Sequence, residues 1–173
     1  MGKSETSTGA VCDTGPIIHL DELDSVQLLS DFSLWAPKAV IDELHYHRPS
    51  AFNRISAFCQ VKESLEPLLP NLLALGRAFS LEKGEFEALS LMSCIPNAIF
   101  LTDDAAARLV AQQLGYKVHG TIGVLIRAIR QGNLTVNQVI ELLRAIPKRS
   151  SLFVRNALLE EIVGQIENEF DIN

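Results

Sequence analysis

Two kinds of hydrophobic pattern alternate along the 173-residue chain. Short apolar runs end at a polar or turn-forming residue, and each is followed by a stretch in which apolar positions recur every three or four residues, the period of a helix. The strands predicted from the short runs are residues 10–12, 34–36, 99–101 and 116–119. Repeated strand-then-helix units predict an α/β fold with a parallel sheet flanked by helices.

Capping and turn-forming residues set the limits of the predicted helices. Pro16 suits the first turn of a helix, Ser80 is a plausible N-cap, and Gly115 and Gly132 are typical residues just after a helix end. The helices expected from these signals begin near residues 17, 38, 50, 80, 105, 124, 135 and 151. Residues 46–80 are expected to form a helical arm beside the sheet, because apolar residues there step by three or four at Ile55, Phe58, Val61, Leu65 and Leu68.

Length and composition fit one domain with its own core, since 47% of the residues are hydrophobic. We expect a disordered polar tail at 1–9, the main domain at 10–132, and C-terminal helices at 133–173 packed on that domain. The first residues lack the apolar core of a signal peptide, and no run reaches the ~18 apolar residues of a membrane span, so a cytoplasmic protein is expected. The formal charge of −6 excludes nucleic-acid binding by overall charge, so such a substrate would need a local basic rim or a metal.

Carboxylates follow the predicted strands at the positions where ligands bind in open α/β sheets. Asp13 follows the first strand, and Asp103 and Asp104 follow the strand at 99–101. Three glutamates lie on or near the neighbouring predicted helices, namely Glu43, Glu85 and Glu87. Each acid has a simpler interpretation, because the aspartates could be N-caps and the glutamates could be solvated helix charges.

Several carboxylates at one edge of a sheet repel each other and raise one another's pKa unless a cation intervenes. Oxygen ligands of this kind suit Mg²⁺ or Mn²⁺, which activates a water and neutralises charge that develops on a phosphate. The acids together therefore point to phosphodiester hydrolysis.

Short motifs in a fixed order resemble those of the PIN-domain nucleases, and in particular the VapC-like branch. The resemblance spans about residues 10–132. It rests on the segments 11–20 (VCDTGPIIHL), 36–44 (APKAVIDEL), 84–88 (GEFEA), 101–108 (LTDDAAAR) and 120–125 (GTIGVL). The resemblance implies a three-layer fold with a parallel sheet of four or five strands, and a metal-dependent ribonuclease site built from three or four acids.

Carried over position by position, the resemblance implies that Asp13 is the first acid and Glu43 the second. The third is Glu85 or Glu87, in place of the aspartate usual in the family, which lengthens the ligand. The fourth lies in the Asp103-Asp104 pair, where Asp104 matches the Thr-x-Asp pattern better and Asp103 could share the ion. Candidates for substrate contact are Thr14, Thr102, Arg48 and Arg108. Aromatic residues are few, so base stacking on exposed rings is not expected.

The resemblance further implies an RNA substrate and the role of a toxin held inactive by a small antitoxin protein. Apolar faces on the last two predicted helices make a homodimer plausible. The alternative is a PIN-like nucleic-acid-binding or regulatory module with a weak site, acting through protein partners.

Overall fold

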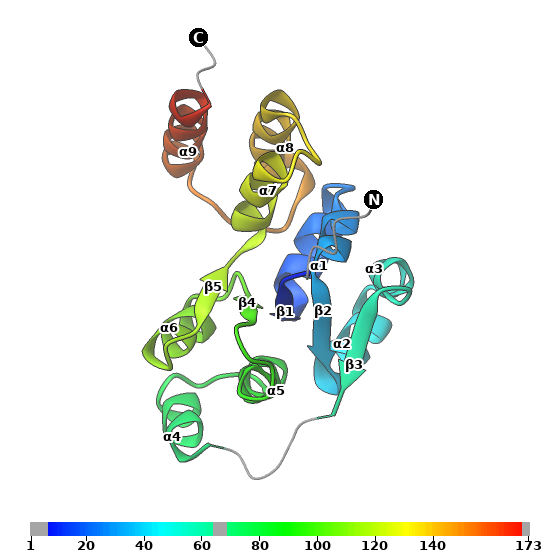
Figure 1. Cartoon of the computed structure of the whole chain (residues 1–173), viewed down its shortest axis with the longest axis vertical. Coiled ribbons are helices and arrows are strands. Elements are labelled where there is room, and N and C mark those ends of the chain that lie inside the picture. The colour runs from blue at the N-terminus through cyan, green and yellow to red at the C-terminus, as the bar shows by residue number, and fades with distance from the viewer. Residues whose placement is uncertain (1–6, 64–68, 171–173) are drawn as a thin grey trace.

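The computed structural model describes residues 7–63 and 69–170. Within them, five strands form one sheet in which every neighbouring pair is parallel, in the order β3-β2-β1-β4-β5 (Figure 1). The strands are β1 (Gly9–Cys12), β2 (Ser33–Pro37), β3 (Cys59–Lys62), β4 (Ile99–Leu101) and β5 (Lys117–His119). The helices are α1 (Thr14–Glu22), the 3₁₀ helix η1 (Val26–Asp31), α2 (Lys38–His47), α3 (Pro49–Ile55), α4 (Pro70–Ala78), α5 (Lys83–Met92), α6 (Ala105–Gln113), α7 (Thr121–Arg130), α8 (Val136–Arg149) and α9 (Asn156–Glu169). The predicted α/β three-layer fold is confirmed.

Parallel pairing puts the carboxyl ends of the strands at one edge of the sheet. In the central strand β1, Ala10 lies opposite Leu34 of β2 and Ile99 of β4. The chain leaves β1 at Asp13, whose backbone N–H donates to the carbonyl of Leu101 at 2.9 Å. The residues that follow β1 and β4 are therefore held side by side.

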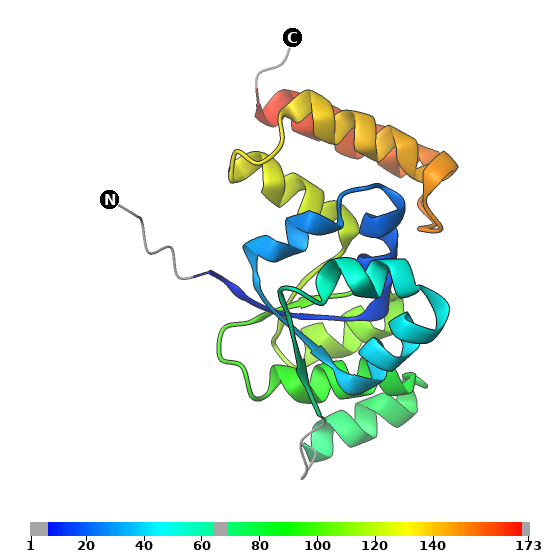
Figure 2. The ribbon, with the colours of Figure 1, turned by 90° about the vertical axis from the view of Figure 1, so that its right-hand side faces the viewer.

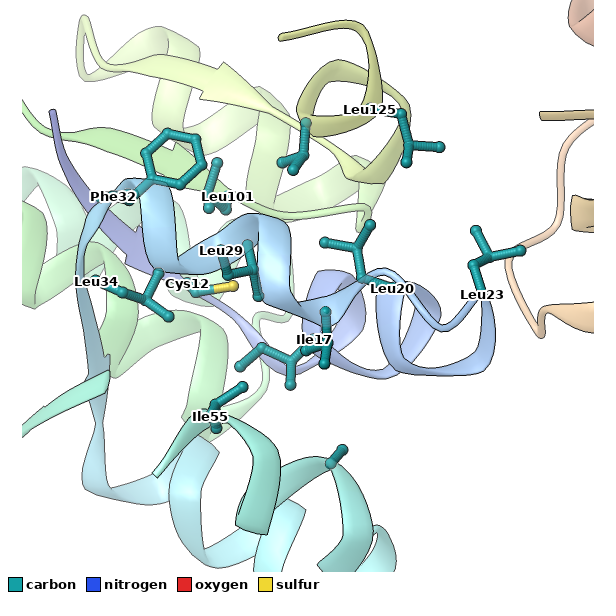
Figure 3. Close-up of a cluster of buried hydrophobic side chains, with 14 of the residues drawn as sticks. Cys12, Ile17, Leu20, Leu23, Leu29, Phe32, Leu34, Ile55, Leu101 and Leu125 are labelled. Carbon is teal, nitrogen blue, oxygen red and sulfur yellow. The ribbon is translucent and has the colours of Figure 1, made fainter. Parts of the chain in front are cut away.

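Alternation within the strands gives the sheet two apolar faces. In β1, Ala10 and Cys12 belong to one core and Val11 to the other, as the two-residue period of a strand requires. The first core includes α1, η1, α3 and α7, and Figure 3 shows Ile17 and Leu29 near Cys12. The second core includes α4, α5 and α6. Buried side chains of α8 and α9 also join the first core, and Figure 2 shows these helices as an outer layer beyond α7.

The expected helical arm at residues 46–80 is wrong in its middle part. Helix α3 ends at Ile55, and residues 59–62 form strand β3, which pairs with β2. β3 is an edge strand whose Val61 is 52% exposed, so it lacks the apolar run of a buried strand. The spacing of Ile55, Phe58 and Val61 imitates a helix although these residues span a turn and a strand. The last two apolar positions of the expected arm fall in residues 64–68, outside the described part of the chain.

Several predicted helix starts are also wrong. Helices α1 and α7 begin at Thr14 and Thr121, each three residues before the expected start. The N-cap of α5 is Glu82 and not Ser80, which instead adopts a positive φ of 53° in the preceding turn. Helix α9 starts at Asn156, so residues 150–155 form a non-helical connection between α8 and α9. Within residues 7–63 and 69–170, no helix combines the length and the apolar character needed to cross a membrane.

Candidate active site

A pocket of about 370 Å³ lies at the carboxyl edge of the sheet, where β1 and β4 end. Strand ends and neighbouring helices contribute six carboxylates to its lining, and these are Asp13, Glu43, Glu82, Glu85, Asp103 and Asp104. Residues 14–15, 19, 84 and 151–153 supply the rest of its described lining. The structure thus brings together five of the six acids that the sequence singled out.

Asp13 lies deepest among these acids, with only 7% of its surface exposed. It is the N-cap of α1, where its Oδ1 accepts from the N–H of Thr14 at 2.8 Å. Its Oδ2 accepts from the hydroxyl of Thr102 at 3.2 Å. Burial raises the pKa of Asp13 to about 6, and the charges of Glu43 and Asp104 add to the rise although the two hydrogen bonds oppose it.

Glu43 reaches the pocket from α2 and is tied to the segment after β1. The hydroxyl of Thr14 donates to its Oε2 at 2.7 Å, so Thr14 contacts both Asp13 and Glu43. Helix α5 approaches this pair closely at Gly84, where an added Cβ would lie 3.7 Å from Oε2 of Glu43 and 3.9 Å from Oδ1 of Asp13. The first turn of α5 therefore lies against these two carboxylates.

The structure distinguishes the two glutamates of α5. Glu85 lines the pocket, and its Oε2 accepts from the backbone N–H of Glu82 at 2.9 Å. Burial raises the pKa of Glu85 to about 7, with Asp104 and Asp13 adding to the rise. Glu87 instead points toward α2, where its carboxylate accepts from the N–H of Ala39 at 3.3 Å. Residues two apart on a helix face different directions, so only one of them can reach the pocket.

Asp104 is the N-cap of α6 and lies at the exposed side of the pocket. Its Oδ1 accepts from the N–H of Ala107 at 2.8 Å, while its own N–H donates to the hydroxyl of Thr102 at 3.1 Å. Thr102 therefore connects Asp104 to Asp13. Because Thr102 is completely buried, the structure places it behind the acids and not where a substrate could touch it.

Asp103 lines the same pocket but is bound to neighbouring elements. It accepts from the N–H of Thr121 at 2.8 Å, from the hydroxyl of Thr121 at 2.6 Å, and pairs with Nδ1 of His19 at 2.8 Å. Burial alone would raise the pKa of Asp103, but the hydrogen bonds from His19 and Thr121 outweigh it and hold the pKa below its usual value. Asp103 thus joins the end of β4 to α1 and to the start of α7.

The two predicted arginine contacts lie outside this pocket. Arg48 pairs with Oε1 of Glu22 at 3.0 Å. Arg108 donates to the carbonyl of Thr102 at 3.1 Å and lines an adjacent pocket. Thr14 does line the acidic pocket, in agreement with its predicted position.

Sequence reasoning missed four parts of the site: His19, Thr121, Glu82 and the connection at residues 150–155. His19 lies in the segment 11–20 and Thr121 in the segment 120–125, yet only the fold shows that both contact Asp103. Glu82 precedes a predicted acid by three residues, the spacing of a capping pair, and this signal could have found it. Residues 151–155 of this connection were predicted to be helical, and nothing in their sequence indicates the pocket.

The carboxylates of the pocket are of the type that binds a divalent cation, although the described side chains lie too far apart to hold one ion together. Carboxylate oxygens are the ligands that Mg²⁺ and Mn²⁺ prefer, and a bound cation would favour the ionised forms of Asp13 and Glu85. Among the residues that the structure describes, no three His, Cys, Asp or Glu side chains are grouped closely enough to hold an ion as they stand. Hard-cation chemistry therefore fits these residues by type, and their side chains would have to converge around an ion.

The parallel sheet and its carboxylate pocket define the class of protein. It is an α/β protein with an acidic pocket at the place where ligands bind in open sheets. A family model described as "DUF3368: PIN domain" matches residues 9–168, which include both cores and the whole acidic pocket. The chain belongs to the PIN-domain family, a family of nucleases. This match confirms the family resemblance and extends it beyond residue 132 into α8 and α9. No curated protein and no solved structure matches the chain.

Proposed function

We propose that this protein is a metal-dependent endoribonuclease in which Asp13, Glu43, Glu85 and Asp104 hold Mg²⁺ or Mn²⁺. One observation carries the proposal. Four segments far apart in the sequence each deliver a carboxylate to a single pocket, and two of these carboxylates, Asp13 and Glu85, have raised pKa values. Such a cluster is unfavourable for an apo protein and is explained by a cation that the protein binds.

The roles of the chain's own residues follow from their contacts. A divalent cation, when bound, would supply an activated water and stabilise charge on the phosphate. Asp13 and Glu43 would present oxygens oriented by Thr14 and Thr102. Asp104 would act from the open side of the pocket, where substrate enters. Asp103 would keep α1, β4 and α7 in position around the acids, as a positioning residue and not as a ligand.

Glu85 would lose its proton when a cation binds near neutrality. Its pKa of about 7 in the metal-free protein means that part of the population is protonated at neutral pH, and that proton would be displaced by a bound cation. A third acid of this length would reach from the first turn of α5 toward Asp13 and Asp104. These two contribute to its raised pKa.

Cleavage of a single-stranded RNA by the purified protein tests the proposal. We expect cleavage with Mg²⁺ or Mn²⁺ and none with a chelator, and we expect Asp104→Asn to be inactive. Asparagine also caps helices well, so this change leaves the start of α6 intact. Full activity of Asp104→Asn would contradict the assignment of this acid.

Within this function, we propose the cellular role of a toxin controlled by a small antitoxin in the cytoplasm. The support is the motif resemblance to the VapC-like branch. Expression of the wild-type chain should then arrest growth, and Asp13→Ala should relieve the arrest. A homodimer stays a prediction, because the buried residues of α8 and α9, such as Leu143 and Val163, pack within the chain itself.

A second candidate function is a PIN-like regulatory module that binds RNA without cutting it. The described acids favour this function, because no three of them lie close enough together to hold a metal ion as they stand. The two functions differ in one outcome, since a module of this kind would bind RNA in the presence of Mg²⁺ and leave it intact.

A further inference from the structure

The connection between α8 and α9 lies across the rim of the acidic pocket. Ser151, Leu152 and Phe153 line that pocket, and Figure 2 shows the connection extending from the outer layer toward the side on which β1 runs into α1. Glu22 at the end of α1 fixes this segment. Its Oε2 accepts from the hydroxyl of Ser150 at 3.0 Å and from the N–H and hydroxyl of Ser151 at 2.6 and 2.9 Å.

Phe153 lies two residues after Ser151 and is 88% exposed, more than any other large hydrophobic residue in the described part of the chain. A phenyl ring exposed to solvent lacks the favourable free energy that comes from burying its apolar surface. The hydrogen bonds to Glu22 nevertheless hold its backbone beside the pocket. An exposed ring on a segment anchored at the rim is suited to contact a ligand that lies in the pocket.

A second pocket, of about 550 Å³, lies on the other side of Phe153. It shares Asp103, Leu152 and Phe153 with the acidic pocket, so the two pockets are adjacent. Its lining differs in charge, because it includes Arg108 and Arg155. A path along the rim therefore leads from a carboxylate cluster, past the exposed ring, to a mostly apolar pocket that contains two arginines.

Charge favours a polyanion along this path. A cation in the acidic pocket would attract one phosphate, while the two arginines could contact the phosphate of a neighbouring nucleotide. The ring of Phe153 offers a face on which an unstacked base can lie. A single-stranded nucleic acid supplies phosphates and bases in this alternation, whereas a folded duplex keeps its bases stacked.

We propose that Phe153 stacks on a base of the single-stranded RNA next to the scissile phosphate, and that Arg155 and Arg108 bind the adjacent phosphate in the second pocket. This inference rests on the proposed ribonuclease function and adds a substrate-binding residue to it. It differs from the expectation, drawn from the few aromatic residues, that base stacking on exposed rings is not indicated.

Substitution of Phe153 tests the inference in the full-length protein. We expect Phe153→Ala to raise KM for a single-stranded RNA roughly 5- to 150-fold, the range that corresponds to loss of one stacked base, while kcat changes little. Phe153→Trp should keep the wild-type KM because it preserves a stacking surface. Tyr46→Ala is the matched control, since Tyr46 is 82% exposed but lines neither pocket.

A spectroscopic measurement separates stacking from a merely structural effect. Binding of an RNA that carries 2-aminopurine beside the cleavage site should quench its fluorescence in the inactive Asp104→Asn protein. We expect the quenching to disappear in Asp104→Asn/Phe153→Ala and to persist in Asp104→Asn/Tyr46→Ala. For the second pocket, Arg155→Ala should weaken RNA binding and reduce its salt dependence, whereas Lys148→Ala, at a cation outside both pockets, should not.

The possible failures are distinguishable. If the wild-type protein cuts RNA and Phe153→Ala matches Tyr46→Ala in KM and quenching, the stacking role is overturned while the ribonuclease function stands. If Phe153→Ala instead converts a wild-type dimer to a monomer without a change in KM, the ring belongs to an interface between copies and the inference is wrong. If the wild-type protein neither binds nor cuts any RNA, the proposed function itself fails.

Discussion

Asp13 shows how one residue can serve the fold and the site together. It ends β1, caps α1 through the N–H of Thr14, and lies buried beside Glu43 and Asp104. The cap stabilises the helix, but burial of the same carboxyl disfavours the charge with which it would bind a metal. The buried, ionised form of Asp13 is therefore unfavourable for the stability of the metal-free protein but is the form that would bind a cation.

The two glutamates of α5 give a matched pair of substitutions. We expect Glu85→Gln to reduce metal-dependent RNA cleavage by about 100-fold or more, because it removes both a ligand oxygen and a titratable group. Glu87→Gln should leave cleavage close to that of the wild type, since Glu87 bonds to α2 outside the pocket. Initial rates of RNA cleavage by the two variants at saturating Mg²⁺ measure the difference. An equal loss of activity in both would contradict the assignment of Glu85 as the third acid.

The raised pKa values also predict a pH dependence of stability in the metal-free protein. The pKa of Asp13 rises from 3.8 to about 6, and that of Glu85 from 4.5 to about 7. Between about pH 4 and 7 the folded state therefore holds more protons than the unfolded chain, so the free energy of unfolding falls as pH rises. For Asp13 alone, the shift of about two units corresponds to roughly 3 kcal/mol.

Denaturant unfolding at pH 5 and pH 8, in the presence of a chelator, measures this effect. We expect the neutral variant Asp13→Asn to lose less stability than the wild type between the two pH values, and to be more stable than the wild type at pH 8. A wild-type protein that gains stability over this range relative to Asp13→Asn would show that the sign is wrong.

At the scale of elements, the site depends on close contacts between helix starts and strand ends. Helix α7 begins at Thr121, which binds Asp103 after β4, and Gly120 permits this approach. An added Cβ at Gly120 would overlap the carboxylate of Asp103 and lie 2.9 Å from the guanidinium of Arg108. Helix α5 lies against Asp13 and Glu43 at Gly84, but less tightly, because an added Cβ there would lie at ordinary contact distance, 3.7 Å from Glu43 and 3.9 Å from Asp13. Small residues at helix starts thus set how closely the acids gather.

Gly120→Ala should therefore destabilise the protein by about 1–3 kcal/mol, the usual cost of overpacking, and should lower RNA cleavage as Asp103 shifts. Gly164→Ala is the control, because an added Cβ in α9 meets no atom of the described structure within 4 Å. Alanine is the better helix former, so this change should be neutral or stabilising by up to about 1 kcal/mol. Equal stability of the two variants in urea unfolding would contradict the close packing inferred at Gly120.

At the scale of the whole molecule, the C-terminal layer is part of both the core and the pocket. Buried side chains of α8 and α9 join the first core, and the connection between these helices reaches the pocket at Phe153. The family match likewise continues to residue 168. The described chain therefore packs as one unit, in which a late segment lines a pocket formed by early strands and helices.

Sequence reasoning found the parts that depend on local pattern. Apolar runs that end at Asp13 and at Asp103-Asp104 indicate buried parallel strands, and strand direction then places the acids at one edge. It could not choose between Glu85 and Glu87, because the rotation of α5 about its axis is set by tertiary packing. It missed β3 because an exposed edge strand carries no apolar run, and it missed Phe153 because only the folded chain brings that residue to the pocket.

The central claim is that the gathered carboxylates form one site for a divalent cation. Thermal unfolding of the wild type and of Asp13→Asn during a Mn²⁺ titration tests it most directly, with Glu87→Gln as the control. We predict that Mn²⁺ stabilises the wild type and Glu87→Gln, by about 2.7 kcal/mol at 100 times the Kd, and that Asp13→Asn responds much less. Identical curves for the wild type and Asp13→Asn, or no response in the wild type, would contradict the account.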